Sequence, residues 1–469
     1  MKYIFLLLPV IFLFSCAEKV TIEQIDNQQN SGNFAEAARL INLYMAENKF
    51  SEQDIYDLNF RKDVMRRIEL DFNKTKDDVT AYIQKYYPGV DDTALDKWVA
   101  DGSLEAMTIN GERKYFDRAA PNLFRINRDA KRQKEHIDGG QNPDAITLFK
   151  QKDIPEIVAG EAQSVTVKIK YAVTLKPDAV PDGETVRCWL PFPNENCSRQ
   201  SEIRLISAND SNYVISPKEY AHRTLYMQKI ARKGEPLTFE IAFSYRSVPV
   251  FADVENSRSG LFQLSSEETD EYLSERPPHI VFSKNIKDLS EKIIGNEKDP
   301  VLKVKRIFEY IDQNYPWAGA REYSTVPNIP EYVMENGHGD CGMKTLLFIT
   351  LARYNGIPAK WESGFMVHPG AKNLHDWGAY FVDGRGWIPV DQSFGLNKWA
   401  DETRERYFYM TGTDAYHLAV NTDYSRPLFP EKIHPRSETV DFQRGELEWR
   451  GGNLYFDAWD WDWEVEYGF

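Results

Sequence analysis

The chain has 469 residues, of which 42% are hydrophobic, and its formal net charge is −15 at pH 7. This length predicts two to four domains, and the apolar content excludes a disordered chain. The densest basic run, residues 125–134, is interpreted as the solvated face of a helix or as a linker, and the acidic balance argues against nucleic acid as a partner.

The first residues are typical of an export signal. Lys2 precedes an apolar run that is too short for a stable membrane span. The segment Leu13-Phe14-Ser15-Cys16 resembles a bacterial lipobox, which implies cleavage before Cys16 and lipidation of its sulfur; an ordinary signal peptide cut nearby is the alternative. We therefore predict a signal peptide over 1–16, membrane contact through a lipid anchor only, and a place in the bacterial cell envelope, facing the periplasm or the cell surface.

Three regions follow along the chain. Apolar residues at helical spacing over 17–145 predict an α-helical accessory domain with a hairpin at Asn110-Gly111. Alternating segments over 155–252 predict a β-sandwich of several short strands. Residues 280–469 return to helices and then strands, and they end in an extension rich in aromatic and acidic side chains. We expect this extension to pack on the preceding domain or to line a binding surface, because exposed tryptophan at such density is costly.

The four cysteines are Cys16, Cys188, Cys197 and Cys341. Outside the cytoplasm cysteines tend to pair. Cys188 and Cys197 flank one short segment and could pair across a turn, but the sequence leaves open whether their backbones are close enough. Cys341 is then the odd thiol, which marks it as a candidate for a reactive role.

Cys341 lies at the start of an apolar, helix-periodic segment that Asn355-Gly356 ends. The unpaired amides and the dipole of a helix N-terminus favour a thiolate, and the same amides can donate to an oxyanion. His375 is the candidate base, because it lies where a loop enters a predicted strand. Asp391, at the end of the next predicted strand, is the candidate carboxylate that orients the imidazole.

Four motifs then occur in order: Gly339-Asp340-Cys341-Gly342, Gly356-Ile357-Pro358-Ala359, His375-x-Trp377 and Val390-Asp391-x-Ser393. This order and spacing resemble the transglutaminase-like superfamily, relatives of the papain-like thiol proteases, over roughly residues 280 to 395. The resemblance implies a nucleophile at Cys341, a general base at His375 and an orienting acid at Asp391. The whole chain also resembles a lipoprotein subgroup of Bacteroidetes type.

Other site residues follow from the resemblance. A polar or aromatic residue upstream completes the oxyanion hole in the superfamily, and the candidates here are Tyr315, Trp317 and Tyr323. Asp376 stands where many members carry an apolar residue, and it could compete for the imidazole or shape the substrate site. Trp377 is a candidate site wall, although the core is the default place for an aromatic side chain.

The predicted fold is therefore of the α+β class: a papain-like transglutaminase core preceded by a β-sandwich and an α-helical N-terminal region. The predicted reaction is acyl transfer at an amide bond of a peptide or protein through a thioester, most simply hydrolysis by a peptidase or amidase, with transamidation as the other outcome. The rival hypothesis is a catalytically silent domain that binds a peptide or glycan. A zinc site at His338, Asp340, Cys341 and His375 is disfavoured because no CxxC or HExxH motif is present, so no metal and no cofactor are predicted.

Overall fold

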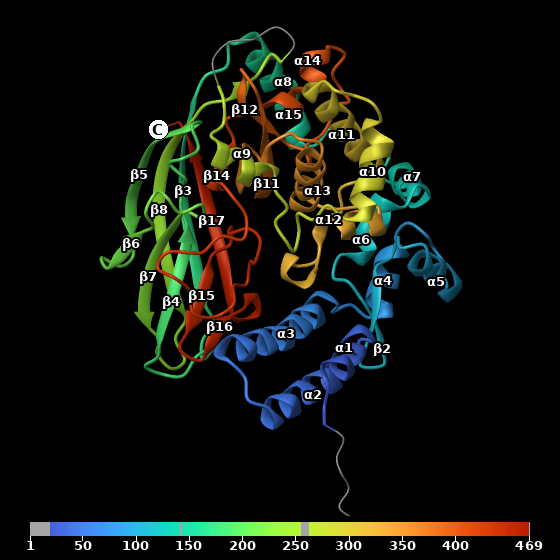
Figure 1. Ribbon diagram of the computed structural model, residues 1–469, viewed down its shortest axis with the longest axis vertical. Coiled ribbons are helices and arrows are strands. Elements are labelled where there is room, and N and C mark those ends of the chain that lie inside the picture. Colours follow the sequence, from blue (N-terminus) through green and yellow to red (C-terminus); the bar gives the residue numbers. More distant parts are fainter. Residues whose placement is uncertain (1–18, 141–142, 255–261, 469) are drawn as a thin grey trace, which may run out of the picture.

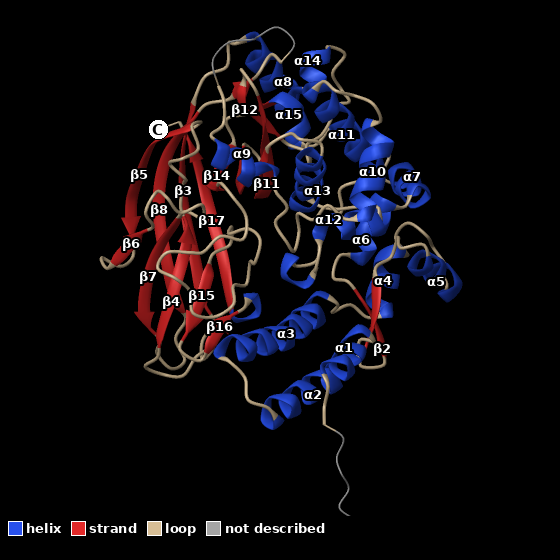
Figure 2. Cartoon of the chain, viewed as in Figure 1, coloured by secondary structure: helices blue, strands red, loops and turns tan. Residues whose placement is uncertain are grey.

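The computed structural model describes residues 19–140, 143–254 and 262–468. The predicted signal peptide and the lipidation site Cys16 lie outside the described residues. Figures 1 and 2 show a layered β-region on one side of the molecule, a helical region on the other, and a group of N-terminal helices beneath both. Within the described ranges, no helix is long and apolar enough to cross a membrane. The mixture of helices with antiparallel sheets confirms the α+β class.

The N-terminal region is helical and has a core of its own, which includes Ile25, Phe34 and Leu123. Side-chain caps from Thr21, Ser51 and Thr75 begin three of its helices, since each hydroxyl accepts a backbone N–H of the first turn. The predicted hairpin is confirmed between β1 and β2. The elements are α1 Ile22–Asn30, α2 Phe34–Glu47, α3 Glu52–Asp71, α4 Lys76–Ile83, α5 Asp92–Ala100, β1 Ala106–Ile109, β2 Glu112–Tyr115, α6 Ala119–Ile126 and α7 Arg128–Ile137.

The β-sandwich is built from two segments that are far apart in the sequence. One sheet has the strand order β16-β15-β4-β7-β6 and the other β17-β3-β8-β5. The strands are β3 Val165–Leu175, β4 Thr185–Pro191, β5 Gln200–Ala208, β6 Tyr213–Ile215, β7 Thr224–Ile230, β8 Leu237–Ser247, β15 Glu446–Trp449, β16 Gly452–Leu454 and β17 Trp459–Tyr467. The predicted boundaries are thus corrected: the aromatic extension completes this sandwich and does not belong to the preceding domain alone.

The reason for this correction is visible in β17. Trp459 and Trp463 are buried in the sandwich core, while Asp460 and Asp462 between them are exposed. This alternation is the pattern of a strand with one buried face. β17 pairs with β3 in antiparallel orientation over nine residue pairs and so becomes a strand of the sandwich. The tryptophans that looked costly at the surface are therefore core residues of the sandwich.

The third region packs helices on a four-stranded antiparallel sheet of order β12-β11-β10-β14. Helix α13 Cys341–Tyr354 lies at its centre, and residues 342–353 are all buried. The sheet strands are β10 Ala359–His368, β11 Ala371–Val382, β12 Gly386–Val390 and β14 His417–Asn421. The remaining elements are α8 Ala145–Ala159, β9 Val250–Phe251, α9 Ser266–Leu273, α10 Lys284–Ile294, α11 Pro300–Asn314, the 3-10 turn Tyr323–Thr325, α12 Ile329–Asn336, α14 Thr403–Arg406, α15 Phe408–Thr411, β13 Gly412–Thr413 and the 3-10 turn Phe456–Ala458.

The candidate disulfide is not formed: Cys188 and Cys197 are both free, buried thiols. Cys188 lies within β4 and points into the sandwich core. Cys197 follows in the next loop and packs against Trp377 and Ala419 of the other sheet. The two thiols therefore belong to different buried clusters, Cys188 to the sandwich core and Cys197 to the group with Trp377 and Ala419.

Candidate functional site

Cys341 is the first residue of α13, as the sequence predicts. Gly337 ends α12 in the left-handed conformation, with φ of 72°, and lets the chain turn back. Gly339 then pairs with Trp317 in a short parallel bridge. Asp340 is the N-cap, and its Oδ1 accepts the Met343 N–H at 3.1 Å. These contacts leave Cys341 partly exposed at the mouth of a cleft of about 320 Å³.

The thiol of Cys341 contacts a carboxylate. Its Sγ donates to Oδ2 of Asp376 at 3.2 Å. The hydroxyl of Tyr323 donates to Oδ1 of Asp340 at 2.6 Å, lies 3.3 Å from Oδ2 of Asp376, and accepts the N–H of Gly342 at 3.1 Å. Cys341, Asp376, Tyr323 and Asp340 therefore form one connected group at the start of α13.

His375 is not part of this group, because successive residues of a strand face opposite sides of the sheet. A Cβ added at Gly378 would lie 3.6 Å from Thr345 on α13, so Gly378 and Asp376 face that helix. His375 and Trp377 have the opposite parity, and Trp377 packs on the far face against Cys197. The predicted triad is thus corrected: the structure brings Asp376 to Cys341 and turns His375 away from it.

The other half of the predicted triad is assembled. Nε2 of His375 lies 2.7 Å from Oδ2 of Asp391, and both side chains are buried. Oδ1 of Asp391 accepts the N–H groups of Ser393 and Phe394, which fixes the carboxylate. His375 also stacks on the ring of Phe394, with 4.6 Å between the ring centres.

This pair is part of a larger buried network, which the sequence analysis did not find. We call it the His–Asp network; its members are His375, Asp391, His417, Asp414 and His368. His417 bridges two carboxylates: its Nε2 lies 3.0 Å from Asp391, and its Nδ1 lies 2.9 Å from Asp414. Asp414 also contacts Nε2 of His368 at 3.0 Å. Since both nitrogens of His417 face carboxylates, the ring is held as an imidazolium. The sequence carried no spacing signal for the His–Asp network, because its members come from separate strands and loops.

The electrostatics agree with this description. Burial lowers the pKa of His417, but Asp414 and Asp391 outweigh burial and raise it to about 9. Burial acts to raise the pKa of Asp391, and the contacts with His375 and His417 nevertheless hold it below its ordinary value. Burial lowers the pKa of His375, with Asp391 opposing that shift.

Two overlapping sets of residues in the His–Asp network have ligand atoms within 4.8 Å of one another and could hold a metal ion. One set is His375, Asp391 and His417, and the other is His368, Asp414 and His417. In the present geometry hydrogen bonds already occupy the donor atoms of both sets. The zinc ligands that the sequence analysis weighed, His338, Asp340, Cys341 and His375, do not form such a set in the described residues, where His375 groups with Asp391 and His417 instead.

The environment of Cys341 disfavours a thiolate, contrary to the expectation from the helix N-terminus. Burial, then the charges of Asp376 and Asp340, raise the pKa of the thiol well above its ordinary value. Burial and the charge of Asp340 likewise raise the pKa of Asp376 to about 8. A helix dipole contributes only about 0.3–1 kcal/mol, so these carboxylates and the burial outweigh it.

The remaining candidate residues divide between the site and the core. Tyr323 and Asp376 lie at Cys341, and Trp317 lines the same cleft. Tyr315 ends α11 and packs on Tyr310 in the core, and Trp377 is fully buried on the far face of the sheet. Tyr315 and Trp377 therefore do not line the cleft.

Substituting Gly342 by Ala tests how tightly this group is packed. A Cβ at this position would lie 2.3 Å from the Tyr323 hydroxyl and 2.7 Å from Oδ2 of Asp376. We expect Gly342→Ala to destabilise the protein by about 1–3 kcal/mol, because something must shift to relieve the overlap. Thermal unfolding measures the loss, and adding Tyr323→Phe, which removes the nearest atom, should recover part of it. An unchanged melting temperature in Gly342→Ala would contradict this packing.

Known proteins resemble this chain over part of its length. The family model for the transglutaminase-like superfamily matches residues 287–392. An uncharacterised protein of Haemophilus influenzae is 25% identical over 236 residues, which cover 44% of this chain and 63% of that protein, so the chain spans less than two thirds of its relative.

Three solved structures also align. A candidate cysteine protease from Cytophaga hutchinsonii gives a TM-score of 0.43 at 14% identity and covers 66% of this chain and 91% of that one. The periplasmic domain of TgpA from Pseudomonas aeruginosa gives 0.27 at 12% identity, with coverage of 52% and 91%. A candidate protease from Parabacteroides distasonis gives 0.19 at 11% identity, with coverage of 50% and 67%.

Proposed function

We propose, from the premise that residues 287–392 are a transglutaminase-like core domain, that this chain transfers acyl groups at amide bonds through Cys341. The contact that supports the proposal is the 3.2 Å hydrogen bond from the Cys341 thiol to Asp376, at the first turn of α13 and in an open cleft. It joins a nucleophile to a group that can take its proton, which is the minimum that covalent catalysis by a thiol needs.

The proposed reaction begins at this pair. The thiol proton passes to the Asp376 carboxylate while Sγ bonds to the carbonyl carbon of the amide. The carbon–nitrogen bond then breaks, and the amine leaves with the proton from Asp376. Water adds to the thioester, the carbon–sulfur bond breaks, and the thiol regains a proton, so the net reaction is hydrolysis. An amine in place of water would give transamidation.

The N–H of Gly342 lies beside the sulfur and is the candidate donor to the negative oxygen of the intermediate. The N–H of Gly342 points to the Tyr323 hydroxyl, and that hydroxyl in turn donates to Asp340. A carbonyl oxygen that displaced the Tyr323 hydroxyl from this N–H would gain the first-turn amide as a donor. Tyr323 thus acts as a positioning residue that keeps the amide oriented before substrate binds.

The proposed setting is the bacterial cell envelope, with a lipid anchor at Cys16 and a peptide or protein as substrate. The support is the apolar N-terminal run and its lipobox-like end, Leu13-Phe14-Ser15-Cys16. Under this proposal the described residues act outside the cytoplasm. A lipid at Cys16 would provide the whole membrane attachment.

Trapping of the covalent intermediate tests the proposal. Protein lacking residues 1–16 is incubated with peptide thioesters and p-nitrophenyl esters, and the digested protein is then examined by mass spectrometry. We expect an acyl adduct on the peptide that contains Cys341, and none in Cys341→Ala. Cys197→Ala is the matched control, because Cys197 is a buried thiol outside the cleft. Turnover that is unchanged in Cys341→Ala would rule out this nucleophile.

A second candidate is the catalytically silent binding module. The observation that favours it is the position of His375, which leaves a carboxylate and no imidazole in contact with the Cys341 thiol among the described residues. A silent module would form no adduct on Cys341. It would also bind its peptide or glycan equally well in wild-type protein and in Cys341→Ala.

A further inference from the structure

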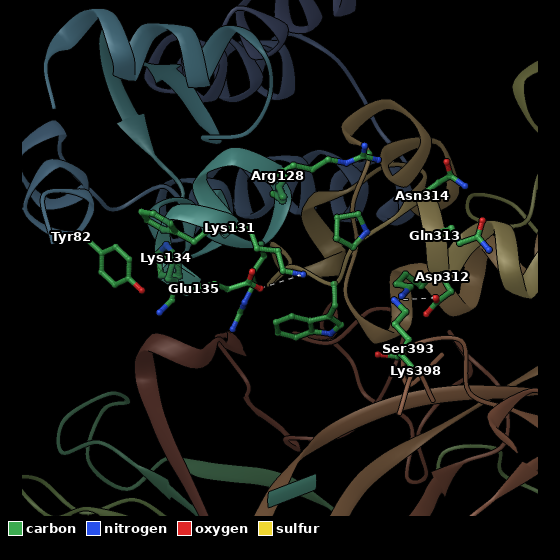
Figure 3. A pocket seen from close by; sticks show the side chains of 18 residues that line it. Tyr82, Arg128, Lys131, Lys134, Glu135, Asp312, Gln313, Asn314, Ser393 and Lys398 are labelled. Carbon is green, nitrogen blue, oxygen red and sulfur yellow. Dashed lines mark ion pairs between the residues drawn. The ribbon is translucent and has the colours of Figure 1, made fainter. Parts of the chain in front are cut away.

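A second cleft, of about 750 Å³, lies between the N-terminal helices and the transglutaminase-like domain. Figure 3 shows its lining, in which charged side chains of α7 face residues at the end of α11. Six cations line it: Arg125, Arg128, Lys131, Lys134, Lys344 and Lys398. We call it the cationic cleft.

The cationic cleft carries an excess of positive charge in a chain whose net charge is −15. Two carboxylates, Glu135 and Asp312, line the cleft beside these six cations, and Asp138 outside the lining pairs with Lys134. Glu135 lies 4.0 Å from Lys131, and Asp312 lies 3.3 Å from Lys398. The sequence analysis interpreted residues 125–134 as a solvated helix face or a linker, but the fold turns the basic side of α6 and α7 towards another domain, where it forms a wall of a cavity.

One of the cations is built into the core. Lys344 lies one turn after Cys341 on α13, and only 3% of its surface is exposed. Burial lowers the pKa of its ammonium group, while Asp312 and Asp391 favour the charged form. Within the described part of the chain, no hydrogen bond to this ammonium is formed, so its donors can serve a ligand in the cationic cleft.

The cationic cleft adjoins the cleft of Cys341. Trp317 lines both, and the guanidinium of Arg125 lies 4.6 Å from the centre of its ring. The backbone next to Trp317 is bonded to the loop before Cys341: Ala318 N–H donates to Gly339 O at 3.2 Å, and Gly339 N–H donates to Pro316 O at 3.3 Å. Trp317 is therefore a wall that the two clefts share, which places the cationic cleft next to the cleft of Cys341.

The two clefts differ in the charge of their walls. The cleft at Cys341 is lined by seven carboxylates against three arginines, and Asp340 and Asp376 are the carboxylates beside the thiol, so it disfavours an acidic residue there. The cationic cleft favours acidic groups. A ligand that fits both has acidic residues at one end and uncharged or basic residues next to the reacting amide.

We propose that the cationic cleft binds an acidic segment of the peptide substrate and thereby presents the adjoining, non-acidic segment to Cys341. The inference rests on the proposed function, because only an amide substrate has a reason to span both clefts. Carboxylates held by Arg128 and Lys131 would form charge-assisted hydrogen bonds, with Lys344 at the buried end of the cationic cleft.

Peptide binding tests this inference without depending on catalysis. Cys341→Ala protein lacking residues 1–16 is titrated, by calorimetry and by tryptophan fluorescence, with a hexaglutamate peptide extended by Gly-Ala-Lys and with its hexaglutamine counterpart. We expect the acidic peptide to bind and the neutral one not to bind. Arg128→Gln/Lys131→Gln should weaken binding about tenfold or more, because two charge-assisted contacts are lost. Raising the salt concentration from about 50 mM to about 200 mM should also weaken binding, because exposed charges are screened.

The control is Lys49→Gln/Lys97→Gln, which removes the same charge from exposed positions of the helical region that line neither cleft. Equal binding of the two peptides would overturn the inference, as would equal weakening by the control and cleft variants. Tighter binding of inorganic phosphate or of a sulfated glycan than of the acidic peptide would also overturn it. Peptide binding without any acyl adduct on Cys341 would leave the cationic cleft assigned and would count against the proposed chemistry alone.

Discussion

The substitution Asp376→Asn is expected to lower the pKa of the Cys341 thiol and, at the same time, to lower turnover. The amide keeps the shape of the carboxylate but removes the negative charge 3.2 Å from Sγ, so the thiolate should form at a pH roughly one unit lower or more. Under the proposed function the same change also removes the proton acceptor, which should lower turnover about 100-fold or more. A thiol that becomes easier to ionise in a slower enzyme is the signature of Asp376 as the base.

The matched variant is His375→Gln. Because His375 lies on the other face of β11, we expect this substitution to leave the pKa of the Cys341 thiol unchanged. The rate of iodoacetamide reaction at Cys341 against pH, followed by mass spectrometry of the peptide that contains it, measures the thiol pKa. The wild-type midpoint should lie above that of an ordinary thiol, and turnover should rise with pH through about 8, where Asp376 becomes ionised. A midpoint near neutrality that rises in His375→Gln would instead support the triad that the sequence predicts.

The second large effect is expected from His417→Gln. This change removes the imidazolium between Asp391 and Asp414, so each of these two buried carboxylates loses a cationic partner. Removing one partner of a buried ion pair typically costs about 3–5 kcal/mol of the free energy of unfolding. Urea unfolding at pH 6 measures the loss, and His136→Gln on the exposed side of α7 is the control. A loss of unfolding free energy no greater than in the control would contradict a charged His417.

The pH dependence of this loss follows from the directions of the shifts. The pKa of His417 is raised to about 9 from an ordinary value of 6.5, so its contribution to stability is complete below about 6.5 and disappears as the pH rises through about 9. The pKa values of Asp391 and Asp414 are lowered, so their contribution is present above about 4 and disappears as the pH falls through the lowered values. The difference between wild type and His417→Gln should therefore be largest near pH 6 and shrink above pH 9. A difference that does not vary with pH would show that His417 is neutral.

The order of the motifs determined several features of the site. The segment from Gly339 to Gly342 indicates a helix that starts with a cysteine, because a small residue and an N-cap aspartate precede the apolar run. The spacing of His375 and Asp391 places them on neighbouring strands, and the structure has them 2.7 Å apart. These are local properties, set by capping and by strand length.

The side of the sheet on which each residue lies could not be predicted in the same way. The dipeptide His375-Asp376 offers α13 either an imidazole or a carboxylate, and a shift of one residue exchanges the two. The choice depends on which neighbours fill each face. Trp377 fits between Cys197 and Ala419, and Gly378 leaves room for Thr345 of α13. Packing therefore decides which residue contacts Cys341. Asp376 faces α13, and His375 lies in the His–Asp network on the other face of the sheet.

The sequence by itself determined the helices, the strands and the thiol at a helix start, because hydrophobic periodicity, capping and turn residues act over a few neighbouring positions. Tertiary structure decided what required distant segments to meet. It paired β17 with β3 and so completed the sandwich with the end of the chain. It also joined His417 to Asp391 and brought the basic residues of α6 and α7 against the third region as the cationic cleft. Those contacts depend on the free energy of burying whole faces, which no local pattern encodes.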